Sequence, residues 1–223
     1  MEVVYEDNHI IIVNKAPGEI VQGDKTGDEP LVETVRRYLK EKYNKPGNVF
    51  CGVVHRLDRP VAGLVIFAKT SKALGRLNEM LRDGKIKKTY WALVRNRPPK
   101  DSDRLVHYIT STEKNNKSYA TVSPKAGAKE AALSYEVIGR TDRFTLLSIN
   151  LETGRKHQIR VQLSSIGSPI RGDLKYGDTR SNPDGSISLQ AHEIEFEHPV
   201  SHQMIKVSAP WPASWPEPVV ERG

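Results

Sequence analysis

The sequence has little of several features that mark particular classes of protein. It contains a single cysteine, Cys51, in 223 residues, so no disulfide can form within the chain and a cysteine-based metal cluster is excluded. No apolar run approaches the length of about 18 residues needed to span a membrane, and residues 1–15 place acids ahead of a short apolar run, the reverse of a secretory signal. Neither a Walker-type loop nor a GxGxxG pattern is present. We therefore expect a protein of the reducing cytoplasm that binds no nucleotide cofactor.

The charge is unbalanced toward the basic side. Lys and Arg total 34 against 27 Asp and Glu, which gives a net charge of +7 and an isoelectric point near 9.4. A surplus of this size favours a polyanionic partner, of which nucleic acid is the commonest. Ordinary solubility charge would give the same composition, so the charge alone leaves both interpretations open.

Apolar residues that alternate between turn-forming residues predict a succession of strands. The predicted strands cover residues 3–5, 9–14, 50–54, 63–70, 86–96, 105–112, 119–123, 131–139, 144–151, 187–197 and 204–209. Helical spacing predicts one helix that starts near Pro30, a second capped by Ser71, and a third over residues 157–166. Strands so close in sequence pair antiparallel. We predict an α+β fold, a mostly antiparallel mixed sheet of roughly seven to nine strands with flanking helices, in a single domain over residues 1–223.

The C-terminal segment over residues 210–218, PWPASWPEP, is too rich in proline for a helix or a strand. Its tryptophans are expected to pack on the surface.

The segment HRLDRPVAGLVIFAKT, residues 55–70, joins a polar turn to an apolar run with the length and β-branched content of a buried strand. Asp58 lies between Arg56 and Arg59, and nearby positive charge favours the ionised carboxylate. Such a carboxylate can act as a nucleophile or a general base. A salt-bridged turn without catalytic function would show the same pattern.

Basic residues are dense between residues 153 and 177. If residues 157–166 are helical, His157 and Arg160 share one face while the aliphatic residues face the core. Arg155 and Lys156 lie at the start of this helix, where its dipole disfavours positive charge. The conflict indicates phosphate binding, although a solvated basic turn would also explain it.

Tyr90, in the strand KKTYWALV, is a third candidate. A strand tyrosine is usually part of the core, but here it follows three lysines, and interleaved aromatic and cationic groups are typical of surfaces that bind single-stranded nucleic acid. The histidines are scattered without HExxH or Cys/His spacing, so no metal site is predicted.

Five segments of the chain resemble, in order, the motifs of the RluA-type pseudouridine synthases. They are IIIVNKAPG, HRLDRPVAGLVIFAKT, KKTYWALV, TGRKHQIRVQLSSIGSPIRGDLKYG and LQAHEIEFEHP, which together span nearly the whole chain. This family converts uridine in RNA to its C-glycoside isomer without cofactor or metal. The resemblance therefore implies a pseudouridine synthase catalytic domain that acts on tRNA or rRNA.

The resemblance also implies roles for single residues. Asp58 would be the catalytic carboxylate, Tyr90 would stack on the target base and help to remove the C5 proton, and Arg160 would pair with Asp58. Arg56 would fill the gap that the flipped uridine leaves in the RNA. The RNA-binding set predicted from the two basic segments is His55, Arg56, Arg59, Arg155, Lys156 and His157.

The sequence departs from the family in two ways. The residues after HRLD are often Asp-Thr-Ser-Gly-like, whereas here Arg59-Pro60-Val61-Ala62-Gly63 follows, so we expect altered loop contacts with activity retained. Longer members carry a basic RNA-binding domain ahead of the catalytic domain, and we expect none here because the first predicted strand begins near residue 3. Substrate choice would then come from the catalytic domain or a partner, and a monomer is the simpler expectation.

Two alternatives to a synthase are open. A non-catalytic RNA-binding or RNA-chaperone protein on the same fold would keep the basic surface but would not need Asp58, Tyr90 and Arg160 together. An aspartate-dependent hydrolase would need a second carboxylate or a metal partner, and the sequence offers neither in a recognisable pattern.

Overall fold

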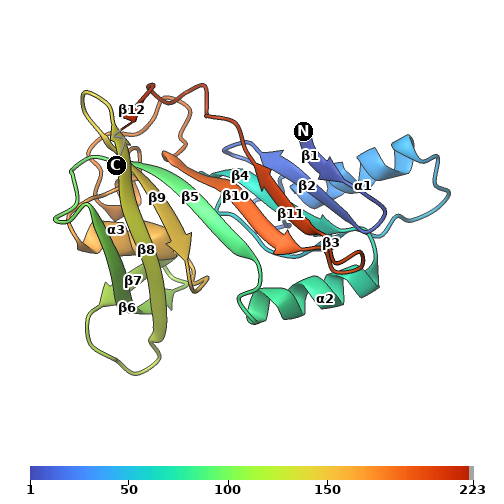
Figure 1. Cartoon of the computed structure of the whole chain (residues 1–223), viewed down its shortest axis with the longest axis horizontal. Coiled ribbons are helices and arrows are strands. Elements are labelled where there is room, and N and C mark those ends of the chain that lie inside the picture. The colour runs from blue at the N-terminus through green and yellow to red at the C-terminus, as the bar shows by residue number, and fades with distance from the viewer. Residues whose placement is uncertain (221–223) are drawn as a thin grey trace. The chain divides into compact units, whose positions relative to one another are not determined.

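The computed structural model describes residues 1–220, which form two compact units (Figure 1). The first unit contains Met1–Lys87 and Ala191–Pro210, and the second contains Lys88–Gln190 and residues 211–220. Both combine antiparallel strands with helices, which confirms the predicted α+β class. Within residues 1–220, none of the helices has the length and apolar character that crossing a membrane requires.

The strands of the first unit pair in the order β1-β2-β4-β10, with β3 beside β4 and β11 beside β10. Their bounds are β1 Glu2–Glu6, β2 Ile10–Lys15, β3 Gly52–Val53, β4 Ala62–Ala68, β10 Leu189–Glu197 and β11 Met204–Ser208. The central strands β2 and β4 pair antiparallel, with Lys15 opposite Gly63. Two helices, α1 (Leu31–Lys42) and α2 (Ser71–Arg82), complete this unit.

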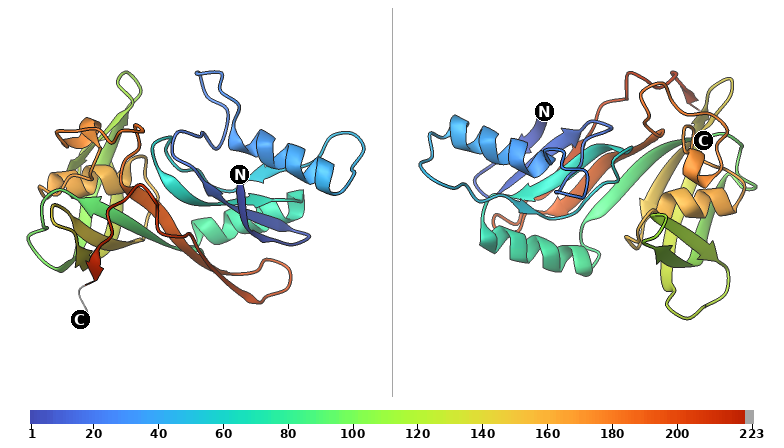
Figure 2. Two further views of the ribbon diagram at one scale, coloured as in Figure 1. Left: turned by 90° about the horizontal axis from the view of Figure 1, so that it is seen from above. Right: turned by 180° about the vertical axis from the view of Figure 1, so that it is seen from behind.

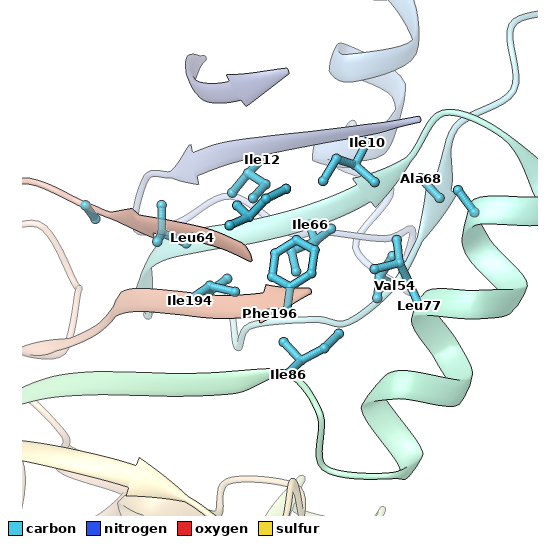
Figure 3. Packing of buried hydrophobic residues seen from close by; sticks show 13 residues of the cluster. Ile10, Ile12, Val54, Leu64, Ile66, Ala68, Leu77, Ile86, Ile194 and Phe196 are labelled. Atoms are coloured by element: carbon cyan, nitrogen blue, oxygen red, sulfur yellow. The ribbon is translucent and has the colours of Figure 1, made fainter. Parts of the chain in front are cut away.

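The core of the first unit is aliphatic. Alternate residues of β2 and β4, such as Ile12 and Ile66, pack with Phe196 of β10 and Leu77 of α2 (Figure 3). The intervening residues of β2 and β4 point to the opposite face and are also fully buried. Strands buried on both faces read as continuous apolar runs, which is why the sequence shows IIIV and LVIFA there. Close packing on both faces, rather than an alternation of apolar and polar residues, therefore specifies the register of β2 against β4.

The second unit contains a sheet with the strand order β5-β9-β8-β6-β7, to which β12 adds at the end of β8. The bounds are β5 Lys87–Val94, β6 Ser102–Thr112, β7 Lys117–Thr121, β8 Lys129–Arg140, β9 Thr145–Leu151 and β12 Val219–Val220. Helix α3 (Gln158–Ser165) and the 3₁₀ turn η1 (Leu174–Tyr176) lie against this sheet (Figure 2). Val161 of α3 and Tyr176 of η1 pack with Ile109 of β6 and Ala131 of β8.

The three predicted helices are present, and several details differ from the sequence prediction. The strand expected over residues 50–54 shortens to Gly52–Val53, and β12 and η1 had no signal strong enough to predict them. The described residues contain twelve strands, one more than the eleven predicted ranges and more than the seven to nine expected for the sheet. The cap of α2 is Thr70, whose Oγ1 accepts a hydrogen bond from the Ala73 N–H at 3.1 Å, so Ser71 is the first helical residue.

The C-terminal tryptophans were expected on the surface, and this expectation is wrong for Trp215. It is buried against Leu93 of β5 and Leu146 of β9, and Trp211 contacts it edge to face at a centroid distance of 5.2 Å. The prolines exclude a helix or a central strand, but burial of an aromatic ring needs no regular backbone. The segment over residues 210–218 therefore packs its tryptophans on the second unit's sheet without forming a helix or a strand.

Gly63, at the second position of β4, is required by a close approach of two strands. Its φ is +118°, and a Cβ built on it would lie 2.3 Å from the Ala191 carbonyl oxygen of β10. We expect Gly63→Ala to lower the free energy of unfolding by about 2–4 kcal/mol, because backbone strain and a clash with backbone atoms add together. Gly75→Ala on α2 is the matched control: its Cβ would meet open space, so it should stabilise by about 1 kcal/mol. Urea unfolding of both variants measures the difference, and equal stability of the two would contradict the assignment.

Candidate active site

Asp58 lies on the loop between β3 and β4, and a buried lysine holds this loop. Lys15, the last residue of β2, is only 1% exposed. Its ammonium donates hydrogen bonds to the carbonyls of Ala16 at 2.9 Å, Arg59 at 3.1 Å and Val61 at 2.6 Å. The Arg59 and Val61 carbonyls belong to the turn that Asp58 begins, in which the Val61 N–H donates to the Asp58 carbonyl at 3.0 Å. The half-buried carboxylate of Asp58 is therefore carried on a backbone anchored to β2.

The electrostatics of Lys15 follow from this enclosure. Burial lowers the pKa of Lys15 to about 8, while the carboxylates of Glu19 and Asp58 oppose the shift and Arg59 adds to it. The ammonium is thus a buried cation compensated by three carbonyls and by two carboxylates of the same unit. Neither the sequence pattern nor the spacing indicated this role, although an unpaired lysine at the end of the run IIIVN was a signal that could have been used.

His55 fixes the other end of the loop. It is 9% exposed, and its Nε2 accepts a hydrogen bond from the Ile66 N–H of β4 at 3.1 Å. An accepting Nε2 places the ring proton on Nδ1, so the imidazole is neutral in this arrangement. The structure gives His55 a part in attaching the loop to β4, and a contact between this side chain and RNA stays a prediction.

The two arginines beside Asp58 have different environments. Arg56 is exposed. The Arg59 guanidinium donates to the Asp28 carboxylate at 2.7 Å and to Thr26 Oγ1 at 2.8 Å, which attaches the preceding loop to the Asp58 turn. The predicted RNA contacts of both arginines stay predictions.

Tyr90 is an interior residue of β5. It lies opposite Ile149 of β9 and is 6% exposed. Because alternate residues of a strand face the same side, Tyr90 shares its side of β5 with Ala92 and Val94, which are fully buried. The sheet thereby fixes the position of the ring.

Arg160 lies in the first turn of α3 and is 6% exposed. Its Nε donates to Asp173 Oδ2 at 2.7 Å and its Nη2 to Asp173 Oδ1 at 2.9 Å, a bidentate ion pair. The guanidinium also lies over the Tyr176 ring, with Cζ 4.9 Å from the centroid. Sequence reasoning missed both partners, although the pattern GDLKYG at residues 172–177 was the signal that could have identified them.

The segment before α3 differs from the sequence prediction. The expected division of the helix into a basic face and a core face is wrong, because residues 158–163 are all buried. Arg155 and Lys156 lie in the exposed turn before the helix, where the Arg155 Nε donates to the Glu130 carbonyl at 2.9 Å. His157 is the N-cap residue, is 8% exposed and has a left-handed φ of 55°. Its Nδ1 lies 2.7 Å from the Tyr176 hydroxyl. RNA contacts of these three residues stay predictions.

The predicted catalytic residues come from both units. Asp58 belongs to the first unit, and Tyr90 and Arg160 belong to the second. Their meeting in one site, including the pair Asp58–Arg160, stays a prediction. Across residues 1–220, no three His, Cys, Asp or Glu side chains are grouped so that they could hold a metal ion.

Lys15 yields a prediction about stability and pH. Its pKa is about 8 in the folded chain and about 10.4 in an unfolded chain, so the unfolded state binds more protons between these values. The contribution of Lys15 to the free energy of unfolding therefore rises as the pH increases from about 8 to about 10.4. Below about pH 8 the full cost of burying the charged ammonium lowers the stability of the fold. Lys15→Met should remove this rise. The free energy of unfolding of wild type minus that of the variant should therefore increase from about pH 8 to about pH 10 in urea titrations. Exposed Lys72→Met is the control, and parallel curves for wild type and Lys15→Met would contradict the burial of a charged ammonium.

Comparison with known proteins identifies the family. The profile of the RNA pseudouridylate synthases matches residues 9–165. The chain is 32% identical over 236 residues to tRNA pseudouridine synthase C of Yersinia pestis, covering 96% of this chain and 88% of that protein. It is 31% identical to tRNA pseudouridine synthase C of Pectobacterium carotovorum subsp. carotovorum, covering 100% of this chain and 62% of the relative. Ribosomal large subunit pseudouridine synthase C of Buchnera aphidicola subsp. Acyrthosiphon pisum is 33% identical, with coverage of 93% and 66%.

Solved structures with the same fold include two human proteins. Human RNA pseudouridylate synthase domain containing 4 superimposes with a TM-score of 0.79 at 20% identity, covering 95% of this chain and 89% of that one. Human RNA pseudouridylate synthase domain containing 1 gives 0.75 at 22% identity, with coverage of 100% and 90%. The chain spans less than two thirds of the length of several curated relatives that it matches. By its sequence match and its fold, the chain belongs to the RNA pseudouridylate synthase family.

Proposed function

We propose that this chain is an isomerase that converts specific uridines of RNA to pseudouridine, with Asp58 as the catalytic carboxylate. The observation that carries the proposal is the anchored Asp58 turn in a chain of this family: the Lys15 ammonium donates to the Ala16 carbonyl directly after β2 and to the Arg59 and Val61 carbonyls within the turn. A reacting group held on a fixed backbone retains its geometry when a large substrate binds.

The reaction is an internal rearrangement. The bond between N1 of uracil and C1′ of ribose breaks, a bond between C5 and C1′ forms, the C5 proton leaves, and N1 gains a proton. The atoms and the oxidation state of the nucleoside are unchanged. Asp58 could attack the sugar, attack the ring or remove a ribose proton, and each route requires its carboxylate within bonding distance of the nucleoside.

Access to the nucleoside requires base flipping. C1′ and C5 of a stacked uridine are shielded, so the base has to leave the stack at a cost of a few kcal/mol. Phosphate contacts of a basic surface can offset this cost. We assign these contacts to Arg56, Arg155 and Lys156, which are exposed, and to Arg59. Tyr90 would then stack on the extruded uracil from its fixed position on β5.

The substrate we propose is folded RNA of the tRNA or rRNA class, acted on in the cytoplasm by a monomeric catalytic domain. Support comes from the relatives' names, which include both a tRNA and a ribosomal large subunit pseudouridine synthase, and from the net charge of +7. The choice of uridine within that class belongs to the contacts around the Asp58 turn.

A genetic complementation experiment tests the proposal. In a strain that lacks the gene, carbodiimide-stop sequencing of tRNA and rRNA should show at least one pseudouridine missing, and the wild-type chain should restore it. Asp58→Ala should not restore it, because no other group replaces the carboxylate. Asp101→Ala, which removes an exposed aspartate bonded to Arg97, is the matched control and should restore the site. If no site is lost, or if Asp58→Ala restores it, the chain is not an Asp58-dependent synthase, and a non-catalytic RNA-binding protein becomes the better interpretation.

Arg160→Met should separate binding from turnover. Arg160 is buried and bonded to Asp173, so its loss should leave RNA affinity nearly unchanged while single-turnover pseudouridine formation falls by about 100-fold or more. Filter-retention binding and tritium release from RNA labelled at uridine C5 measure the two quantities. Arg104→Met removes another arginine with a bidentate carboxylate partner, Glu152, and should turn over normally. An equal loss of binding and turnover would make Arg160 a phosphate contact instead.

A further inference from the structure

The guanidinium of Arg160 is held on two sides by residues to which the family motif gives no separate role. We infer that Asp173 and Tyr176 are positioning residues, which set the orientation of Arg160 for the reaction. The inference rests on the proposed function, because it takes Arg160 to be the partner of the catalytic carboxylate.

Asp173 fixes the plane and direction of the guanidinium. It is 1% exposed, and its two oxygens accept from Nε at 2.7 Å and from Nη2 at 2.9 Å. A bidentate pair of this kind allows one in-plane orientation, so the edge that carries Nη1 points in one direction only. Asp173 thereby determines where Arg160 can present a hydrogen-bond donor to a second carboxylate.

Tyr176 fixes the guanidinium from its face. Its ring centroid lies 4.9 Å from Arg160 Cζ, the distance of a cation–π contact. The Tyr176 hydroxyl accepts the Ser118 N–H of β7 at 2.8 Å and lies 2.7 Å from His157 Nδ1. The ring is therefore attached to β7 and to the start of α3, and it cannot rotate away from Arg160 without breaking these bonds.

The backbone around these residues adopts conformations that only special positions allow. Gly172 has a φ of +87°, and a Cβ there would lie 2.7 Å from the Asn182 amide nitrogen and from the Ser186 carbonyl oxygen. Its N–H donates to Asp178 Oδ2 at 2.6 Å. His157 keeps a left-handed φ of 55°, which costs free energy in a non-glycine residue. Both segments that supply these contacts thus have unusual backbone geometry. Gly172 precedes Asp173, which pairs with Arg160, and His157 itself contacts Tyr176.

The consequence for catalysis is a loss of rate rather than a loss of binding. A guanidinium that is free to rotate still carries its charge, but it meets its partner carboxylate in the productive geometry for only part of the time. Because Asp173 and Tyr176 are buried at 1% and 4% exposure, neither is placed to contact the RNA backbone. Their replacement should therefore lower kcat and leave KM unchanged.

Kinetics of the full chain test this inference. Asp173→Asn should lower kcat by about 10- to 100-fold with KM within about twofold of wild type, and Tyr176→Phe should have a smaller effect in the same direction. In the Arg160→Met background, Asp173→Asn should cause no further loss in single-turnover assays with excess protein, because it acts only through Arg160. A further loss of equal size in that background would overturn the inference. A wild-type kcat for Asp173→Asn would overturn it as well.

A spectroscopic signature reports on Arg160 without any RNA. In the protein labelled with ¹⁵N-arginine, the Nε–Hε cross-peak of Arg160, assigned by its absence in Arg160→Met, should shift and broaden in Asp173→Asn. It should stay sharp in Gln162→Met, a control that removes a fully buried side chain from the same helix and should leave kcat unchanged. If the peak in Asp173→Asn is unchanged, or if kcat follows the melting temperature across all these variants, Asp173 is only a structural residue.

The two proposals fail in different ways. If wild type modifies RNA and Asp58→Ala does not, the proposed function holds. The effect of Asp173→Asn in the Arg160→Met background and the Nε–Hε cross-peak then decide only the role of Asp173. If wild type produces no pseudouridine in any RNA, both proposals are wrong. Should Asp173→Asn not fold, Asp173→Glu and Tyr176→Phe replace it: a kcat closer to wild type for Asp173→Glu than for Arg160→Met supports positioning, and equal losses overturn it.

Discussion

The structure of the loop that carries Asp58 depends on one buried cation. The Lys15 ammonium is 1% exposed and is compensated by three backbone carbonyls, two of them in the Asp58 turn. A buried charge that loses its partners is strongly unfavourable, so the turn cannot move away while Lys15 stays charged. The position of Lys15 is itself fixed by the register of β2 against β4, and that register is specified by side chains buried on both faces. Core packing thus places the Asp58 turn through Lys15, while His55 attaches the other end of the loop to β4.

The second unit fixes its cation by a different combination of contacts. Arg160 is held by a carboxylate in its plane and a tyrosine ring on its face, and the tyrosine is bonded to a neighbouring strand and to the cap of α3. In both units a cation on a regular element is bonded to groups outside that element: Lys15 at the end of β2 to loop carbonyls, and Arg160 of α3 to Asp173 and Tyr176. The proposed isomerisation is redox-neutral, so it would draw on geometry and electrostatics, and immobilised charges are a means of supplying both.

Local chemistry explains which elements could be predicted from the sequence. The runs IIIV and LVIFA predict buried strands, and amphipathic spacing predicts α1 and α2. Helix α3 was located correctly but its faces were not, because a helix buried all round carries no periodic signal. The burial of Trp215 and the pairing of β12 with β8 were also missed, since both join segments far apart in the chain. Two-residue strands such as β3 and β12 are too short to leave a pattern.

The sequence by itself determined the α+β class, the family resemblance, and Asp58, Tyr90 and Arg160 as candidates, because motif residues and strand periodicity are local properties. Only the tertiary structure decided what holds these residues. That Lys15 bonds the Asp58 turn, that His55 accepts from Ile66, and that Asp173 pairs with Arg160 are facts about residues separated by 11 to 46 positions. Such pairs are set by strand register and by the close packing of the interior. Both depend on residues far apart in the chain, so they cannot be predicted from the residue type at a single position.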